Sequence, residues 1–422
     1  MRLLIHNARI VNEGRIFQGS VLIEDQIIAD IIEGTSLPTV RADETLDAHQ
    51  AFLLPGAIDD HVHFRDPGLT HKADMHSESV AARAGGVTSI MDMPNCRPAT
   101  TTLEALDDKF AEAEKNCVVN YSFYFGATND NVSLLPQLDV HRVCGVKVFM
   151  GSSTGNMLVD NKQSLSDIFR LSPLLIAAHC EDQQIISQNA TRLATKYGND
   201  LNVSYHPLIR SREACLASSR LAADLSRRSG ARLHLLHITT AEELLLLGEN
   251  VTGEATVAHL LFSDADYTTL GSRIKCNPSI KTAADRVALR QAVVDGTLCV
   301  IGTDHAPHLL SEKEGGALKA ASGMPMIQFS LISMLDLFGP IVTVERMCHA
   351  PAKLFRIQKR GYIRKGYYAD LVIVRPQSWM LSRNDILSKC KWSPLEGHQF
   401  QHKVVQTFIN GISQKSMPLL FT

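Results

Sequence analysis

The segment LLPGAIDDHVHFRDPG, residues 53–68, places two histidines, an arginine and a Pro-Gly pair directly after an apolar run. The apolar run, bounded by turn-forming residues, is typical of a short buried strand. Successive side chains of a strand point to opposite faces, so His61 and His63 project to the same side. The segment therefore predicts a strand that ends in two possible metal ligands. Alone, such a pair is more often just the polar end of a strand.

Seven further segments have the same design, an apolar run followed by polar residues. With the first, the predicted strands are residues 54–63, 87–95, 119–128, 143–151, 174–182, 232–240, 271–279 and 298–308. Amphipathic helical patterns separate them, for example at residues 102–116 and 211–230. Eight strands that alternate with helices predict an α/β fold, a (β/α)₈ barrel of the TIM type.

The two ends of the chain have a different pattern. Residues 3–11, 19–34 and 44–55 alternate between apolar and polar positions, and so do residues 362–376 and 403–415. This alternation is typical of short strands in a half-buried sheet. We therefore predict a small β-sandwich domain built from residues 1–53 and 355–422, with the catalytic barrel at residues 54–354.

The composition excludes several classes of protein. The chain has 422 residues, 45% of them hydrophobic, and a net charge of −2, which gives no electrostatic case for nucleic acid or an anionic membrane. Nine cysteines without a paired motif favour reduced thiols and a cytoplasmic location. The N-terminus lacks the apolar core of a signal peptide, and the apolar residues 329–342 are too few to span a bilayer.

Polar residues at the ends of five predicted strands are the candidate ligands. They are His61, His63, Lys147, His179, His237 and Asp304. In a (β/α)₈ barrel the carboxyl ends of all strands open on one face, where catalytic residues gather. Singly, each histidine could be structural, Asp304 could cap a helix, and Lys147 could extend to the barrel mouth. Together, imidazole and carboxylate groups suit two adjacent cations such as Zn²⁺.

This set of ligands indicates hydrolytic chemistry. Two cations can generate a hydroxide near neutral pH and polarise a carbonyl group. Asp304 could accept the proton of that hydroxide and pass it to a leaving nitrogen. A buried ammonium at Lys147 is costly, and carbamylation by CO₂ would replace it with an anionic group able to bridge two cations.

Several motifs, taken in order, resemble the amidohydrolase superfamily and, within it, the dihydroorotase family of the class I type. They are HVHFRDPG (61–68), THKAD (70–74), AGGVTSIMDMPN (84–95), KVFMGSSTG (147–155), HCED (179–182), LHLLHITT (233–240), KCNPSIKT (275–282) and GTDHAPH (302–308). The resemblance extends over nearly the whole chain and includes the split terminal β domain.

The resemblance implies two Zn²⁺ ions per subunit, bridged by hydroxide and carbamylated Lys147. It implies that His61 and His63 bind the more buried ion, and that His179 and His237 bind the other. Asp304 corresponds to a ligand that also acts as general acid and base.

The resemblance also assigns a substrate site. Arg65, Asn95 and His308 match positions that hold the substrate carboxylate, and Asn277 matches a position that lines the pocket. An arginine can form a bidentate, charge-assisted pair with such a carboxylate.

The expected activity is the reversible hydrolysis of the cyclic amide of dihydroorotate to N-carbamoyl-aspartate in pyrimidine biosynthesis. The alternatives are an allantoinase or a hydantoinase (dihydropyrimidinase), and a barrel without activity that serves as a scaffold for aspartate transcarbamoylase. The family also implies a homodimer and association with aspartate transcarbamoylase as possible assemblies.

Residues 309–328 could form a lid or a solvated loop. We expect the remaining His71, His76, His206 and His259 to lie at the surface or to cap helices.

Overall fold

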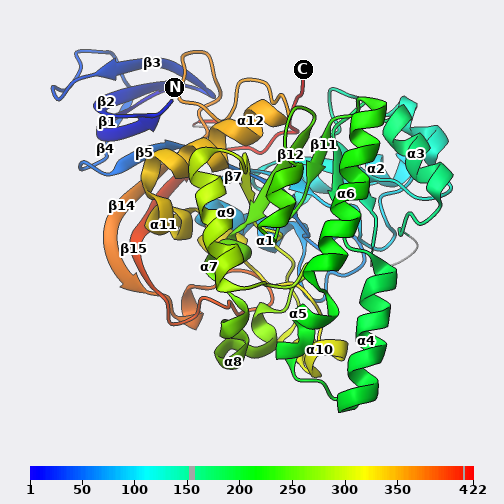
Figure 1. Cartoon of the computed structure of the whole chain (residues 1–422). Helices are drawn as coiled ribbons and strands as arrows, with labels where there is room; N and C mark the ends of the chain where they lie inside the picture. The colour runs from blue at the N-terminus through cyan, green and yellow to red at the C-terminus, as the bar shows by residue number, and fades with distance from the viewer. Residues whose placement is uncertain (152–156, 412–413) are drawn as a thin grey trace.

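The computed structural model describes residues 1–151, 157–411 and 414–422, and its centre is a barrel of eight parallel strands (Figure 1). Each strand pairs with the next along the chain, from β6 to β13. The strands are β6 (Ala57–Val62), β7 (Val87–Asp92), β8 (Asn120–Gly126), β9 (Gly145–Phe149), β10 (Ile176–His179), β11 (Leu233–Leu235), β12 (Val251–Thr256) and β13 (Val300–Gly302). Nearly every strand residue is buried, as expected for parallel strands covered on both faces. This arrangement confirms the predicted (β/α)₈ barrel.

The first and last strands of the barrel meet at a seam. Val62, at the end of β6, forms a parallel bridge with His305, which follows β13. The His63 backbone N–H donates to the His305 carbonyl over 2.8 Å. The Thr303 backbone N–H donates to the Asp59 carboxylate over 3.1 Å. The seam therefore brings the start and the end of the barrel sequence into direct contact.

The predicted seventh strand was wrong. Residues 271–279 contain a 3₁₀ helix, η5 (Gly271–Ile274), and no strand in the described structure. The seventh strand is instead β12, with the sequence VTGEAT. The small and polar residues of β12 resemble a loop in the sequence. In residues 271–279, Ile274 and Cys276 alternate with charged and polar residues, as in a strand. Packing in the barrel overrides these local preferences, because Glu254 is buried with its partners.

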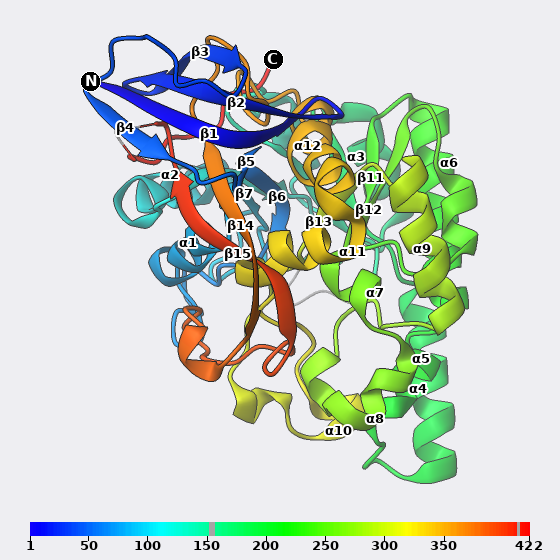
Figure 2. The ribbon, with the colours of Figure 1, turned by 90° about the vertical axis from the view of Figure 1, so that its left-hand side faces the viewer.

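Strands from both ends of the chain form one mixed sheet, as predicted. Its order is β15-β14-β5-β1-β2-β3, and β4 pairs with β1. The strands are β1 (Arg2–Asn12), β2 (Arg15–Glu24), β3 (Ile27–Glu33), β4 (Glu44–Asp47), β5 (Phe52–Pro55), β14 (Leu371–Met380) and β15 (Gln399–Phe408). Figure 2 shows β1 to β3 at one end of the molecule and the long β14 and β15 continuing along the barrel.

Strand β14 joins this sheet to the barrel. Leu371 and Ile373 pack in the apolar core of the terminal sheet, whereas Val372 and Val374 pack in the core of the barrel. Successive side chains of a strand point to opposite faces, so one strand serves both cores. The domain boundaries at residues 53/54 and 354/355 stay a prediction.

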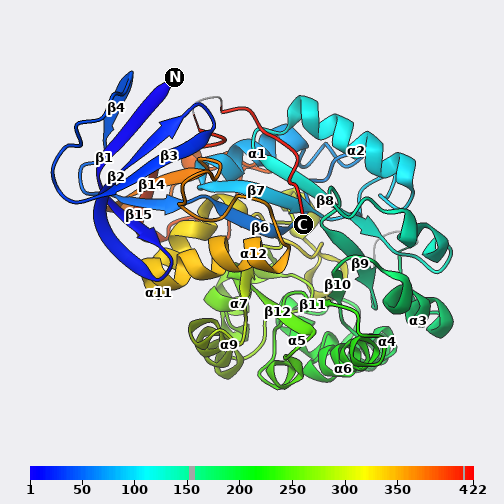
Figure 3. The same cartoon turned by 90° about the horizontal axis from the view of Figure 1, so that it is seen from above.

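Helices surround the barrel strands, as Figure 3 shows from above. They are α1 (Met75–Ala84), α2 (Leu103–Asn116), α3 (Lys162–Leu171), α4 (Gln183–Tyr197), α5 (His206–Ile209), α6 (Arg212–Ser229), α7 (Val257–Leu261), α8 (Tyr267–Leu270), α9 (Ala283–Asp295), α10 (Gly316–Lys319), α11 (Ser330–Val344) and α12 (Ala350–Leu354). Local signals set their ends. In α9, the Thr282 side chain accepts from the Asp285 N–H, and Gly296 ends the helix with a φ of 91°.

The apolar residues 329–342 belong to a longer helical segment, Ile327–Leu354. By length and composition this segment could cross a membrane, with a mean hydropathy of 1.6 in its most apolar window. However, 56% of that window is buried within the fold, and Gly339 interrupts the helix with a φ of 75°. Helix α11 packs against β15 and β1. The segment therefore has the environment of a core helix.

A buried ion pair joins α2 to the barrel. Lys109 Nζ lies 2.6 Å from Asp92 Oδ2, both side chains are 1% exposed, and Asp92 also accepts the Phe64 N–H. Lys109→Met would leave the Asp92 carboxylate buried without its cation, which costs about 3–5 kcal/mol. We expect a clearly lower midpoint of thermal unfolding, and partial recovery in Asp92→Asn/Lys109→Met. A wild-type midpoint for Lys109→Met would contradict this.

Candidate metal centre

A cavity of about 540 Å³ opens where the strands of the barrel end, and it contains all ten predicted site residues. They are His61, His63, Arg65, Asn95, Lys147, His179, His237, Asn277, Asp304 and His308. These residues come from segments spread over 248 positions of the chain, so only the fold brings them together. Their roles as ligands or substrate contacts stay predictions.

Three side chains on the two sides of the barrel seam converge at the base of this cavity. His61 Nε2 lies 3.4 Å from Asp304 Oδ1, and His63 Nε2 lies 3.1 Å from the same oxygen. The possible ligand atoms of these residues all lie within 4.8 Å of one another. This spacing suits one cation held by two imidazoles and a carboxylate.

The outer ring nitrogens of the two histidines are held by further side chains. His61 Nδ1 lies 2.9 Å from Glu254 Oε2, and His63 Nδ1 lies 2.8 Å from Asn95 Oδ1. These contacts turn the Nε2 atom of each ring toward Asp304. Metal-bound histidines typically donate their other ring N–H to such an oxygen, which fixes the ring and its tautomer.

A second pair of imidazoles lies beside the first. His179 Nδ1 is 2.9 Å from His237 Nε2, and the ring centroids of His61 and His237 are 5.4 Å apart. His179 Nε2 lies 2.9 Å from Glu181, which forms a buried ion pair with Arg210. The inner nitrogens of His179 and His237 therefore face each other, as two ligands of one ion would. His237 Nδ1 is buried without a hydrogen-bond partner among the described residues.

Lys147 lies between the two histidine pairs in sequence order and lines the same cavity. It is the third residue of β9 and only 1% exposed. No hydrogen-bond or ion-pair partner is found for its Nζ within the described ranges, and this atom lies over the Phe149 ring, 4.7 Å from the ring centroid. Burial lowers the pKa of Lys147 to about 8, which increases the fraction of neutral amine near neutral pH.

The protonation states fit a cation site. Burial lowers the pKa of His61 and of His63 to about 4, so both rings are neutral and can act as ligands. Burial opposes ionisation of Asp304, but His61, His63 and Lys147 outweigh it, and its pKa is lower than usual. Burial also raises the pKa of Glu254, which opposes a charge on this carboxyl group. A cation on His61 would favour the Glu254 carboxylate.

Three residues that line the cavity have left-handed backbone conformations. The φ angles are 67° at Arg65, 42° at His237 and 47° at Asp304. Such angles are uncommon for residues other than glycine and are found most often at functional sites. All three follow a barrel strand, where the chain turns away from the barrel.

The outer part of the cavity is cationic. Arg65 is 8% exposed, and its Nε donates to the Pro307 carbonyl over 3.1 Å. Its Nη2 lies 3.1 Å from His308 Nε2. Among the described residues, no carboxylate lies within ion-pair distance of Arg65. Asn277 also lines the cavity, and its Oδ1 is buried without a partner among the described residues.

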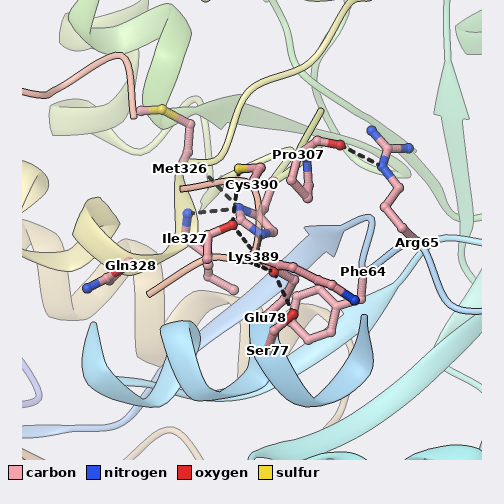
Figure 4. A network of polar contacts seen from close by, with 12 residues as sticks. Phe64, Arg65, Ser77, Glu78, Pro307, Met326, Ile327, Gln328, Lys389 and Cys390 are labelled. Carbon is pink, nitrogen blue, oxygen red and sulfur yellow. Dashed lines mark hydrogen bonds and ion pairs between the residues drawn. The ribbon is translucent and has the colours of Figure 1, made fainter. Parts of the chain in front are cut away.

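A polar network behind the seam supports this wall (Figure 4). His305 Nε2 lies 2.8 Å from Glu78 of α1, and its Nδ1 accepts the Met326 N–H over 3.1 Å. Glu78 also accepts the Lys389 N–H over 2.9 Å. Trp392, which is fully buried, donates its indole N–H to the His308 carbonyl over 2.7 Å. The segment between β14 and β15 thus holds the loop that carries Asp304 and His308.

Sequence reasoning missed several buried residues that support the site. Glu254 was not predicted because β12 was not predicted. Glu181 was noted only as part of the HCED motif and was given no role. His206 and His259 do not lie at the surface, because both are buried, although His206 does occupy the C-cap position of the 3₁₀ helix Val203–Tyr205. They contact the carbonyls of Cys276 and Pro278, at 2.9 and 3.1 Å, on either side of Asn277. Residues 152–155 of the KVFMGSSTG motif lie outside the described residues.

Two family models match the chain. The model described as "Amidohydrolase family" matches residues 174–412, and the model described as "Dihydro-orotase-like" matches residues 50–243. The first model alone extends over more than half of the chain. The chain therefore belongs to the amidohydrolase family, of its dihydroorotase-like type.

Similar proteins in other organisms agree with this assignment. A protein named dihydroorotase from Halobacterium salinarum is 32% identical over 91% of this chain and 92% of its own length. Those from Methanosarcina acetivorans and Methanosphaera stadtmanae are 32% and 30% identical, each over 93% of this chain and 88% and 92% of their own lengths.

Solved structures of hydantoinases share the fold. An L-hydantoinase (dihydropyrimidinase) from Arthrobacter aurescens matches 97% of this chain and 95% of its own, with a TM-score of 0.92 and 26% identity. A dihydropyrimidinase from Brevibacillus agri matches 99% and 98%, with a TM-score of 0.88 and 22% identity. These structures confirm a barrel with a terminal β sheet for this chain.

The contact between Glu254 and His61 predicts a role in metal affinity. In Glu254→Gln the carboxylate is lost, and we expect the affinity for Zn²⁺ to fall about 10–100-fold. Competition with a chromogenic chelator measures this affinity. Glu243→Gln is the matched control, because Glu243 is also buried but accepts from Ser219 and Thr240 instead. Equal affinities for the two variants would contradict a supporting role of Glu254.

Proposed function

We propose that this chain is a dihydroorotase, which reversibly hydrolyses the cyclic amide of dihydroorotate to N-carbamoyl-aspartate in pyrimidine biosynthesis. The family assignment and the relatives that carry this name support the reaction class. The cavity adds a reason from chemistry. It combines a cluster of possible metal ligands at its base with a cationic wall, and the substrate combines a ring amide with a carboxylate.

One observation carries the choice of substrate: the buried guanidinium of Arg65 has no carboxylate partner among the described residues. A buried cation without an anion is costly, so an anionic ligand is the natural complement. Arg65 and His308 offer donors on the same side of the cavity. A carboxylate that accepts from both would place the attached ring over the metal ligands.

We further propose two Zn²⁺ ions per subunit, held by the two histidine pairs, Asp304 and a carbamylated Lys147. When bound, such ions supply hydroxide near neutral pH and polarise the carbonyl group of the substrate. The ligand sets support this count, because each histidine pair turns two ring nitrogens toward one point. Carbamylation would explain a buried lysine whose amine has no described partner.

Residues of the chain bind the substrate and transfer the proton. Arg65 binds the carboxylate and orients the ring amide toward the base of the cavity. Asp304, ionised at neutral pH, accepts the proton released as water adds to the amide carbonyl. It then donates this proton to the ring nitrogen as the carbon–nitrogen bond breaks. Asn95 holds His63 and keeps its Nε2 directed at Asp304.

A hydantoinase or dihydropyrimidinase activity is the second candidate, favoured by the structural similarity to the Arthrobacter aurescens enzyme. Cyclic amides of that kind lack the ring carboxylate and would leave Arg65 unpaired. Allantoinase activity is disfavoured for the same reason. A scaffold without activity would not need the complete set of possible ligands seen here.

Four further expectations stay predictions: a homodimer, association with aspartate transcarbamoylase, a cytoplasmic location and a lid at residues 309–328.

The substrate proposal is tested by measuring turnover of dihydroorotate, hydantoin and allantoin. We expect dihydroorotate to have the highest kcat/KM. Arg65→Met should raise the KM for dihydroorotate about 30–150-fold. This change corresponds to the loss of about 2–3 kcal/mol of binding free energy from charge-assisted hydrogen bonds. Arg142→Met, which removes an exposed arginine paired with Asp107, is the control and should leave KM unchanged. Preference for hydantoin, or an unchanged KM in Arg65→Met, would contradict the proposal.

The bridging role of Lys147 predicts a dependence on bicarbonate. The neutral amine reacts with CO₂, so uptake of labelled bicarbonate by apoprotein should increase as the pH rises through about 8. Lys147→Ala should bind less metal and regain part of it with acetate or propionate, which can replace the carbamate. Elemental analysis and native mass spectrometry measure both. Full metal content in Lys147→Ala without added acid would mean that another group bridges the ions.

A further inference from the structure

Lys72 lies beside the cationic wall of the cavity, in the loop after β6. Its side chain is 8% exposed and lines the cavity. Its Nζ lies 3.1 Å from His308 Nδ1 and 3.0 Å from Glu312 Oε1. An ammonium group only donates hydrogen bonds. The contact with His308 is therefore a hydrogen bond only when His308 Nδ1 carries no proton.

The contact with Arg65 requires the other nitrogen of the His308 ring to be unprotonated. Arg65 Nη2, also only a donor, lies 3.1 Å from His308 Nε2. A neutral imidazole has one acceptor nitrogen, so His308 cannot accept from both cations at once. Burial lowers the pKa of His308, and Arg65 and Lys72 lower it further, so the ring is neutral. The two contacts therefore compete for one ring.

Each tautomer of His308 satisfies a different set of neighbours. With the proton on Nδ1, the ring can donate to Glu312 Oε2, 3.3 Å away, and accept from Arg65. With the proton on Nε2, the ring accepts from Lys72 and offers a donor on the side of Arg65. A carboxylate bound by Arg65 can accept only from this second tautomer. In the first, the lone pair of Nε2 faces the anion and repels it.

We propose that Lys72 is a positioning residue. It holds His308 in the Nε2–H tautomer when a substrate carboxylate binds to the Arg65 guanidinium. This inference rests on the proposed function, since it requires a carboxylated substrate. Lys72 acts through His308 and leaves the metal ligands untouched. It therefore affects substrate binding and not the chemical step. Glu312, which contacts both Lys72 and His308, stabilises the competing tautomer.

Steady-state kinetics test the effect on binding. In Lys72→Met, His308 turns its proton toward Glu312, and we expect the KM for dihydroorotate to rise about tenfold, with kcat within about twofold of wild type. Lys365→Met is the control. Lys365 Nζ also pairs with a carboxylate, Asp30 Oδ1 at 3.7 Å, but it does not line the cavity. A fall in kcat at constant KM, or an equal rise in KM in the control, would overturn the proposal.

The tautomer itself is measurable. In protein labelled at its histidine rings, nitrogen NMR distinguishes the protonated from the unprotonated nitrogen, and the His308 signal is the one lost in His308→Gln. The ligand is orotate, a planar analogue with the same ring and carboxylate. We expect Nε2–H in wild type with orotate and Nδ1–H in Lys72→Met. The same tautomer in both proteins would overturn the role of Lys72. Hydrolysis of dihydroorotate by wild type, measured separately, would still support the proposed function.

Discussion

The contact across the barrel seam is the constraint on which the site depends. His61 and His63 end the first strand, Asp304 follows the last, and 241 positions of chain separate His63 from Asp304. The bridge between Val62 and His305 closes the barrel and places the Asp304 carboxylate 3.1 Å from His63. Without this closure the two halves of the ligand set would not meet. The geometry of the candidate site and the closure of the barrel therefore depend on the same contacts.

Burial then determines the chemistry that these groups can perform. It keeps the imidazoles neutral, so their ring nitrogens are available as ligands, and it makes an uncompensated charge costly. At the base of the cavity, Glu254 and Glu181 hold the outer nitrogens of His61 and His179. At the opening, Arg65 and Lys72 supply positive charge. One cavity thus has a base suited to cations and a wall suited to an anion.

Sequence patterns predicted the barrel and the six possible metal ligands, because strand ends of a parallel barrel open on one face. The other four residues of the candidate site came from the family resemblance, and one of them, Asn277, follows no barrel strand. The pattern could not identify β12, whose small and polar residues are stabilised only by packing in the closed barrel. Glu254 was lost with it. The contact between Lys72 and His308 could not be predicted from the sequence either. The two residues are 236 positions apart, and their contact depends on how two loops fold over the cavity.

The central claim is that these strand ends hold two divalent ions. A crystal grown with Zn²⁺ and measured on both sides of the zinc absorption edge tests it directly. The account predicts two anomalous peaks in the cavity, one between His61, His63 and Asp304 and one between His179 and His237, with density for a carbamate on Lys147 joining them. A cavity without anomalous signal, and with these imidazoles bonded only to protein groups, would contradict it.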